Sequence, residues 1–523
     1  MQKPLKPTSR ASYLLFLVFV LVFAGLGTKL LIFSHAAPAP PASCTYHATT
    51  STFASVFSSA PGGSTICLAP GNYGTWAGGT KTSMVTITPD TAAGATAPTP
   101  PTPSSGGLNA NGTGTNGNVL FSGLNFRNDS FITFDGITFT DDVDMPWGTT
   151  TATVHDITIQ NSIFRAHLEI NDTNMNNANI VINFNMFPAN SADCINGSEG
   201  RIQFSNSSHS ATPDGVIIEN NNIGGVPTVQ CDGIQEGAYG VQILNNWFHD
   251  YHYQNAAHTD GIQLYGSSHS VIKGNFFYDV PDGVVAYDGM VSEDIENNIM
   301  VNDCAGPCNG ASPNQFAMLG NSGSSIAKHN TVVGGNSWAN SPEGVITIGV
   351  KSGTGSCSGL TINDNVATSI GNGSGGGNCT YAASSNDLQQ GGGNGSGNIA
   401  GAPIYNGGDC GNLSADPPGA CGDVWTNFLL KSTSPGHSAA DDGTDMGAFG
   451  SGPSTPGGPY GSSGGSGTTV TGDLNGDGHV NVFDLSIFLN HWQQTGASLP
   501  EDFNNDGTVN IFDLSILLSH YGT

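Results

Sequence analysis

Charged residues, and basic residues above all, are scarce in this chain. Asp, Glu, Lys and Arg make up 10% of its 523 residues, against about 25% in an ordinary globular protein. The sequence holds 12 Lys and Arg against 40 Asp and Glu, which gives a net charge of −28. Only eight of the basic residues lie beyond position 29. Because such a chain cannot neutralise a phosphate backbone, we expect no nucleic-acid partner.

Amphipathic helical patterns are also scarce between residues 45 and 450. The chain contains 74 Gly, and turns of Gly, Asn and Ser separate short runs rich in Val, Ile and Phe. These apolar residues favour strands, and no helical period fits between the runs. The composition therefore predicts an all-β body.

The longest hydrophobic run lies at the N-terminus. Lys3, Lys6 and Arg10 precede an apolar run over residues 13–27, and small residues follow near position 36. Residues 1–36 predict either a cleaved signal peptide or a retained membrane anchor, and residues 37–44 a Pro-rich spacer. Both alternatives predict an extracellular or cell-surface protein that meets the membrane only through this segment.

A unit of strand and turn recurs through the body. Runs such as Ile180–Ile182 and Val216–Ile218 are each followed by Asn and an apolar pair. Successive copies of this Asn lie 23–36 residues apart: Asn185, Asn221, Asn246, Asn275, Asn298, Asn330 and Asn365. Strand-type repeats of this length predict a solenoid. Asn at a fixed turn can share amide hydrogen bonds between coils and tolerates left-handed backbone.

Three segments carry a resemblance to a known fold. Residues 53–57 resemble the amphipathic helix that caps the N-terminal end of β-helix proteins, and residues 63–73 resemble their first coil. Ser434-Pro435 and residues 445–449 resemble their last coil. Residues 45–450 thus resemble the pectate-lyase-like superfamily, which implies an all-β right-handed parallel β-helix. The resemblance specifies the fold rather than the substrate.

Ten cysteines in an exported chain predict disulfide bonds. Neighbours in order lie 23, 37, 4, 22 and 11 residues apart. We expect bonds between these neighbours, most clearly Cys194–Cys231 and Cys357–Cys379. Cys194 and Cys231 both adjoin a repeated acid in adjacent coils, so their Cα atoms could approach within about 4.4–6.8 Å.

Two copies of an oxygen-rich loop follow a flexible linker of Gly, Ser, Pro and Thr over residues 451–471. Each loop has oxygen side chains at positions 1, 3, 5, 9 and 12 and Gly at position 6, and the second copy begins 29 residues after the first. This pattern supplies the hard oxygens that Ca²⁺ prefers, including the main-chain carbonyl at position 7. The expected ligands of two ions are Asp473, Asn475, Asp477, His479, Asn481 and Asp484, then Asp502, Asn504, Asp506, Thr508, Asn510 and Asp513.

Residues 472–523 resemble a type I dockerin, a small α-helical, EF-hand-like calcium module. The resemblance implies docking onto a cohesin-like module, and dockerins are carried mostly by polysaccharide-degrading enzymes. Many dockerins have small polar recognition residues at loop positions 10 and 11, where this chain has Val482-Phe483 and Ile511-Phe512. Because the empty loops would bring six acids together, we expect the module to fold only with calcium.

A second ladder, of acids, runs through the middle coils. Asp232 and Asp260 each begin an Asp-Gly-Ile-Gln sequence, and Asp282 begins Asp-Gly-Val-Val. Stacked acids raise one another's pKa, which suits acid–base work or binding of a third calcium ion. The alternative is structural. Strict alternation would point each Asp inward with the following Ile or Val and leave Gly and Gln outside, so that Asp caps a buried corner.

The residues around Asp260 suggest two chemistries. His258-Thr259-Asp260-Gly261 resembles the Asn-Thr-Asp-Gly motif of polygalacturonase-type glycosidases, which are inverting enzymes with a carboxylic acid and a carboxylate. The later His-Gly and Arg-Ile-Lys motifs of that family are absent. The other chemistry is the β-elimination of β-helix lyases, in which Ca²⁺ neutralises a uronate and a Lys or Arg takes the proton. Lys273 is the best-placed candidate base, and the alternative is that it is a solvated surface residue. Aromatic residues within 247–253 would suit stacking on sugar rings, or would form core and loop.

The sequence therefore predicts an exported enzyme that degrades or modifies an extracellular, acidic polysaccharide by hydrolysis or elimination. The expected catalytic residues are Asp260 and Asp282, with Asp232 and His258 as neighbours and Lys273 as the candidate base. Because the body is itself acidic, bound Ca²⁺ would have to bridge it to a polyuronate. The alternative is a non-catalytic surface adhesin or structural β-helix.

Overall fold

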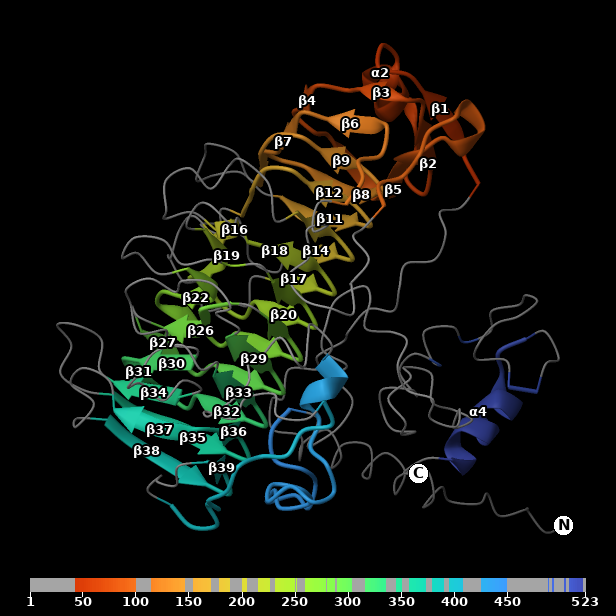
Figure 1. The fold of residues 1–523 in the computed structure, drawn as a ribbon. Coiled ribbons are helices and arrows are strands. Elements are labelled where there is room, and N and C mark those ends of the chain that lie inside the picture. The colour runs from red at the N-terminus through yellow and green to blue at the C-terminus, as the bar shows by residue number, and fades with distance from the viewer. Residues whose placement is uncertain are drawn as a thin grey trace, which may run out of the picture. The chain divides into compact units, whose positions relative to one another are not determined.

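The computed structural model describes the following residues: 43–99, 114–145, 154–170, 178–188, 200–204, 215–225, 231–249, 251, 259–278, 280–286, 289–302, 316–334, 345–349, 357–372, 379–389, 395–407, 425–448, 488, 492, 503–504 and 508–520. Within them the chain is mostly short strands in parallel ladders (Figure 1). The helices described are α2 (Phe53–Ser59), α4 (Ile511–Ser519) and the 3₁₀ turns η1 (Thr91–Ala93) and η5 (Trp425–Phe428). None of the described helices is long and apolar enough to cross a membrane.

Each coil contributes one strand to each of three long sheets, which we call A, B and C. The described strands of the A sheet are β1 (Tyr46–Ala48), β2 (Thr65–Leu68), β5 (Thr80–Pro89), β8 (Ser130–Asp135), β11 (His155–Gln160), β14 (Ile180–Asn183), β17 (Val216–Glu219), β20 (Gln242–Leu244), β24 (Val271–Lys273), β28 (Asp294–Glu296), β32 (Ile326–Lys328), β35 (Cys357–Asn363) and β38 (Cys379–Ser384). Those of the B sheet are β3 (Gly71–Asn72), β6 (Val119–Phe121), β9 (Thr138–Phe139), β12 (Ile163–Phe164), β15 (Met186–Phe187), β18 (Asn222–Gly224), β21 (Trp247–His249), β25 (Phe276–Tyr278), β29 (Ile299–Asn302), β33 (Thr331–Gly334), β36 (Val366–Ala367) and β39 (Asp387–Leu388).

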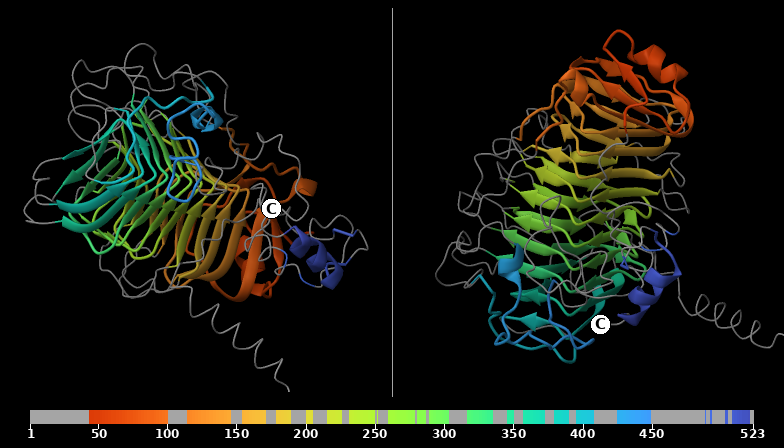
Figure 2. Two further views of the ribbon diagram at one scale, coloured as in Figure 1. Left: turned by 90° about the horizontal axis from the view of Figure 1, so that it is seen from below. Right: turned by 90° about the vertical axis from the view of Figure 1, so that its right-hand side faces the viewer.

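The described strands of the C sheet are β4 (Thr75–Trp76), β7 (Gly123–Asn125), β10 (Val143–Met145), β13 (Leu168–Ile170), β16 (Gly200–Phe204), β19 (Asp232–Glu236), β22 (Asp260–Leu264), β26 (Asp282–Ala286), β30 (Phe316–Leu319), β34 (Val345–Gly349) and β37 (Ser369–Asn372). A small fourth sheet joins β23 (Ser267–Ser268), β27 (Met290–Val291) and β31 (Asn321–Ser322). Neighbours within each sheet come from successive coils and pair in parallel, so equivalent strands stack into continuous walls (Figure 2). The predicted right-handed parallel β-helix is confirmed as the fold of the body.

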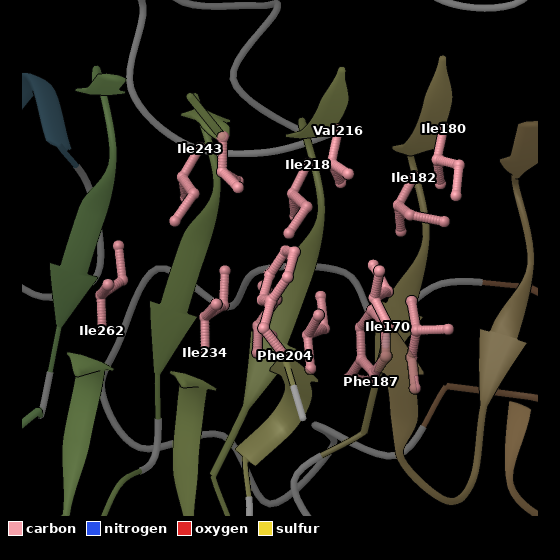
Figure 3. Close-up of a cluster of buried hydrophobic side chains, with 14 of the residues drawn as sticks. Ile170, Ile180, Ile182, Phe187, Phe204, Val216, Ile218, Ile234, Ile243 and Ile262 are labelled. Carbon is pink, nitrogen blue, oxygen red and sulfur yellow. The ribbon is translucent and has the colours of Figure 1, made fainter. Parts of the chain in front are cut away.

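The interior between the walls is apolar because alternate strand residues point into it. Isoleucines from the A and C sheets meet there with Phe187 of the B sheet (Figure 3). The residues labelled in that view are all fully buried: Ile170, Ile180, Ile182, Phe187, Phe204, Val216, Ile218, Ile234, Ile243 and Ile262. Full burial of such a side chain contributes about 1.5–3 kcal/mol to the free energy of folding. Each coil that stacks on the next therefore adds to the stability of the body.

The repeated asparagines form a hydrogen-bonded ladder at the turn between the A and B sheets. Asn221 Oδ1 accepts a hydrogen bond from the Asn185 backbone N–H at 2.9 Å, and Asn221 Nδ2 donates to the Ile182 carbonyl at 2.8 Å. The predicted sharing of amide bonds between coils is confirmed. The left-handed backbone, however, lies one residue earlier, for example at Asn220 and Asn245, whose φ values are 54° and 52°. The ladder residue makes the bonds while its predecessor makes the turn.

Aromatic packing closes the first coils. Phe53 and Phe57 of α2 are buried, and their rings lie 5.0 Å and 4.7 Å from the Trp76 ring. The predicted capping helix is therefore confirmed. At the other end, Ala448 N–H donates to Thr331 Oγ1 at 2.9 Å, which fixes the expected last coil to the B sheet.

Two disulfides join sequential neighbours, as predicted. Cys44–Cys67 and Cys357–Cys379 have Cα–Cα distances of 5.6 Å and 4.5 Å. Cys231 is also disulfide-bonded. Its expected partner Cys194 lies outside the described residues, as do the other four cysteines, the N-terminal segment and the linker.

Candidate acid–base site and calcium module

The structure brings the three predicted acids together at the starts of adjacent C-sheet strands. Asp232 begins β19, Asp260 begins β22 and Asp282 begins β26. Asp260 and Asp282 are direct partners in the parallel register. The Asp260 backbone N–H donates to Asp232 Oδ1 at 2.8 Å. All three are buried, with Asp260 at 0% exposure and the other two at 4%.

The backbone at these strand starts departs from strict alternation. A Cβ added at Gly233 would lie 2.7 Å from the Phe248 ring, and one at Gly261 would lie 2.5 Å from the Phe277 ring. Both rings belong to the apolar interior. The expectation that Gly faces outward is therefore wrong, because there is space there only for a hydrogen atom.

Asp232 consequently contacts the outward-facing polar side chains. Gln235 Nε2 donates to Asp232 Oδ2 at 2.8 Å. One oxygen of Asp232 thus caps the next coil's backbone, as the structural alternative expected, while the other contacts the outer row of the C sheet.

Burial is the main cause that raises the pKa of the Asp260 carboxyl well above its usual value. The negative charges of Asp232 and Asp282 raise this pKa further, as does a hydrogen bond with Asp282. Two carboxyl groups in contact cannot both ionise readily, so one holds the proton and the other accepts from it. Such a pair can serve as proton donor and proton acceptor.

Lys273 is not gathered with these acids. Lys273 ends β24 of the A sheet, a different wall from that of the acids, and its Nζ lies 3.3 Å from Glu296 Oε2. His258 lies outside the described residues. Trp247, Phe248 and Tyr251 are at most 5% exposed, so these aromatic residues belong to buried clusters rather than to an exposed stacking surface.

A polar row on the outer face of the C sheet was anticipated by the sequence reasoning only at the Gln of the Asp-Gly-Ile-Gln copies. Its members are in register on successive strands: Asp144, Glu169, Gln203, Gln235 and Gln263. The available signal was the apolar–polar–apolar pattern of Val143–Met145 and Leu168–Ile170. The row leads along one face to the three acids.

Further acids and a histidine gather at the start of this row. Burial, followed by the charge of Glu169, raises the pKa of Asp144 to about 6. His167 Nδ1 lies 3.1 Å from Asp142 Oδ1, and this hydrogen bond is the largest cause that raises the pKa of His167. The sequence analysis assigned no role to these residues.

The C-terminal module shows part of its second loop. The fully buried carboxylate of Asp513 accepts hydrogen bonds from the backbone N–H groups of Asn504 at 3.1 Å and Asn510 at 3.0 Å. Asn510 also caps α4 through a capping box with Asp513. These groups fit a calcium loop with oxygen ligands, because Asp513, its last acid, lies close to the earlier loop positions Asn504 and Asn510.

The other expected ligands lie outside the described residues, except Thr508, whose carbonyl accepts from Asn510 Nδ2 at 2.8 Å. Ile511 and Phe512, at loop positions 10 and 11, are 59% and 66% exposed. The two residues that differ most from the usual dockerin pattern are therefore accessible to a partner.

Comparisons with known proteins identify this module. Residues 471–521 match the family described as Dockerin type I domain. No curated protein matches the chain. A solved structure of the PL6 family alginate lyase AlyGC and one of its point mutant are each 13% identical, with TM-scores of 0.41 and 0.43.

These matches cover 74% and 73% of this chain but only 57% of either lyase chain, which is less than two thirds of their length. The chain thus joins a parallel β-helix to a C-terminal type I dockerin, a calcium-binding docking module.

Proposed function

We propose that this exported protein acts on an extracellular, acidic polysaccharide while its dockerin attaches it to a cohesin-bearing scaffold or surface. The observation that carries the proposal is the dockerin match over residues 471–521. Dockerin modules are carried mostly by carbohydrate-active enzymes, which they attach to a scaffold. A β-helix has long sheet faces along which a polymer can bind. The two loops of the docking module would each bind one Ca²⁺ ion as its cofactor.

Hydrolysis is the chemistry that the geometry supports better. The buried Asp260 carboxyl, held against Asp282 and Asp232, supplies a proton donor beside a carboxylate. In hydrolysis an acid protonates the leaving glycosidic oxygen, and a carboxylate about 6.5–9.5 Å away takes a proton from the water that adds to the sugar carbon. Because Asp260 is fully buried and hydrogen-bonded to Asp282, this step requires the acids to separate around the bound substrate. Gln203, which is partly exposed in the same row, is suited to hydrogen bonds with sugar hydroxyls.

Elimination has less support because Lys273 is paired with Glu296 in another wall of the helix. Binding of a third calcium ion by the three acids is the alternative use of this site. It would also provide the cation that an acidic chain of net charge −28 needs beside a polyuronate.

The test is an assay of the calcium-loaded full chain on a panel of neutral and uronate-containing polysaccharides. New reducing ends without absorbance of unsaturated uronates would indicate hydrolysis, and both signals together would indicate elimination. Removal of general acid–base catalysis in Asp260→Asn or Asp282→Asn should lower the rate by about 10²–10⁴-fold. Glu296→Gln, on the A sheet, is the matched carboxylate control and should leave the rate unchanged.

Two results would overturn this assignment. Full activity in the Asp260→Asn, Asp282→Asn double variant would show that these acids are not catalytic. A wild-type chain that binds polysaccharides but releases no reducing ends from any of them would favour the adhesin.

A further inference from the structure

We propose that Asp144, His167 and Glu169 form a binding site for a divalent transition-metal ion, such as Zn²⁺, on the outer face of the C sheet. One ligand atom of each residue lies within 4.8 Å of those of the other two. All three side chains are partly exposed, so an ion can reach them from solvent. This site is separate from the calcium loops and does not depend on the proposed polysaccharide activity.

The fold itself places these three groups together. Asp144 and Glu169 are direct register partners on β10 and β13. Their strand neighbours Val143, Met145, Leu168 and Ile170 are fully buried, so alternation directs both carboxylates outward. His167 lies two residues before Glu169, on the same face of the chain.

The carboxylates have no Lys or Arg partner in the part of the chain that the structure describes, and His167 is their nearest basic group. Among the described residues, neither Asp144 nor Glu169 forms a side-chain hydrogen bond or an ion pair with Lys or Arg. Like charges directly opposite each other on neighbouring strands are destabilising. A bound cation would remove this repulsion, and Asp142 adds a further negative charge nearby.

The histidine has a carboxylate partner of the kind that metal-ligating histidines usually have. Its Nδ1 is hydrogen-bonded to Asp142 Oδ1 at 3.1 Å. A carboxylate at Nδ1 selects the tautomer whose lone pair is on Nε2 and makes that nitrogen a better ligand. Asp142 is thus a positioning residue behind the ligand set.

The donor types select the class of metal. Imidazole with carboxylates suits zinc and its neighbours in the first transition row, whereas calcium takes oxygen ligands. Three protein ligands leave a coordination position for water or for a ligand atom. Cys44, His47 and Asp90 also lie close together, but Cys44 is bonded to Cys67 and is not a thiolate ligand.

The site is close to the acids on the same sheet. Two strand steps separate β13 from β19 in the C sheet, which corresponds to about 10 Å. A polymer bound along the polar row would therefore run from the metal position toward the strand that begins with Asp232.

The experiment measures zinc per full chain by equilibrium dialysis and elemental analysis. The protein is first saturated with Ca²⁺ so that the dockerin loops are filled, and Zn²⁺ alone is then added at micromolar concentration. The wild type should bind one equivalent more than His167→Ala and than the isosteric Asp144→Asn, Glu169→Gln double variant. His155→Ala is the matched control, because His155 pairs with Asp156 on the A sheet and should not alter the zinc count.

Asp142→Asn provides a readout of the positioning role. It should retain the zinc equivalent but weaken the affinity by about 10–100-fold. Unchanged affinity would overturn that role.

Equal zinc binding by the wild type and the double variant would overturn the site. If His167→Ala does not give the wild-type circular dichroism spectrum, the isosteric double variant decides the question. Displacement of the additional zinc by millimolar Ca²⁺ would overturn the transition-metal assignment, and resistance to it would support the imidazole ligand.

Discussion

At the scale of the residue, the asparagine ladder is the clearest source of local stability. Asn275 Oδ1 accepts from the Asn246 backbone N–H at 2.9 Å, and Asn275 Nδ2 donates to the Ile243 carbonyl at 2.9 Å. Asn275→Ala would leave both backbone groups buried without these partners. Since each such group costs about 1–3 kcal/mol, we expect the free energy of unfolding to fall by at least about 2 kcal/mol.

Urea denaturation of the full chain measures this loss. Gln242→Ala, a partly exposed polar residue on β20, should change the free energy of unfolding by less than about 0.5 kcal/mol. A loss no larger in Asn275→Ala than in Gln242→Ala would contradict the ladder's energetic role.

Glu293 gives a pH dependence whose sign can be worked out. Burial is the main cause that raises the pKa of Glu293 from 4.5 to about 8. The folded state therefore holds this proton more tightly than the unfolded state does. Its contribution to stability is complete below pH 4.5 and is lost as the pH rises toward about 8.

We expect Glu293→Gln to reduce the fall in melting temperature between pH 5 and pH 8. The amide fits the same partners, since its oxygen can accept from Ser270 N–H, as Glu293 does at 2.7 Å, and its NH₂ can donate to Ser267 Oγ. Some fall remains, because burial also raises the pKa of Asp387 to about 7. An equal or steeper fall in Glu293→Gln than in the wild type would refute this assignment.

At the scale of the element, the start of each acid-bearing strand depends on glycine. A Cβ at Gly261 would lie 2.5 Å from the Phe277 ring and 2.8 Å from the Gly283 carbonyl oxygen. Gly261→Ala should therefore cost about 1–3 kcal/mol of stability through overpacking. Adding Phe277→Leu should recover part of the loss, and thermal unfolding of the single and double variants measures both effects. Additive losses would show that the ring is not the obstacle.

The sequence predicts those elements whose signal repeats from coil to coil. The Asn spacing and the strand runs together predict the β-helix. Cys357–Cys379 was predicted only as a pair of neighbours in sequence order, and the structure shows that the two are register partners. The orientation of Gly233 could not be predicted, because the start of its strand departs from the two-residue alternation. The sheet to which Lys273 belongs could not be predicted either. Each coil contributes strands to three sheets, and the spacing of residues alone does not show which strand belongs to which sheet.

The acids show the same limit. Asp232, Asp260 and Asp282 were predicted to stack because each begins a copy of one motif. Asp144 and Glu169 are equally in register, but they stand in dissimilar sequences and share no motif. Only the pairing of β10 with β13 brings them together.

At the scale of the whole molecule, we expect the stability of the dockerin to depend on calcium and that of the β-helix to be independent of it. The body is held by apolar stacking and hydrogen-bonded ladders that contain no metal ligand of the dockerin loops. The loops instead contain six acids in the sequence, of which Asp513 is held by backbone N–H groups of its own loop, so calcium binding energy becomes folding energy there. We therefore expect chelation to unfold the dockerin while leaving the melting temperature of the β-helix unchanged.

Limited proteolysis of the full chain, read by mass spectrometry, should show new cleavage within residues 471–521 when EGTA is added. A variant that ends at residue 450 should melt at one temperature with or without calcium, because it lacks both loops. A third calcium ion at Asp232, Asp260 and Asp282 would instead stabilise this variant by mass action. A calcium-dependent melting temperature that disappears in the truncated Asp260→Asn variant would replace the shared-proton interpretation of these acids with a metal site.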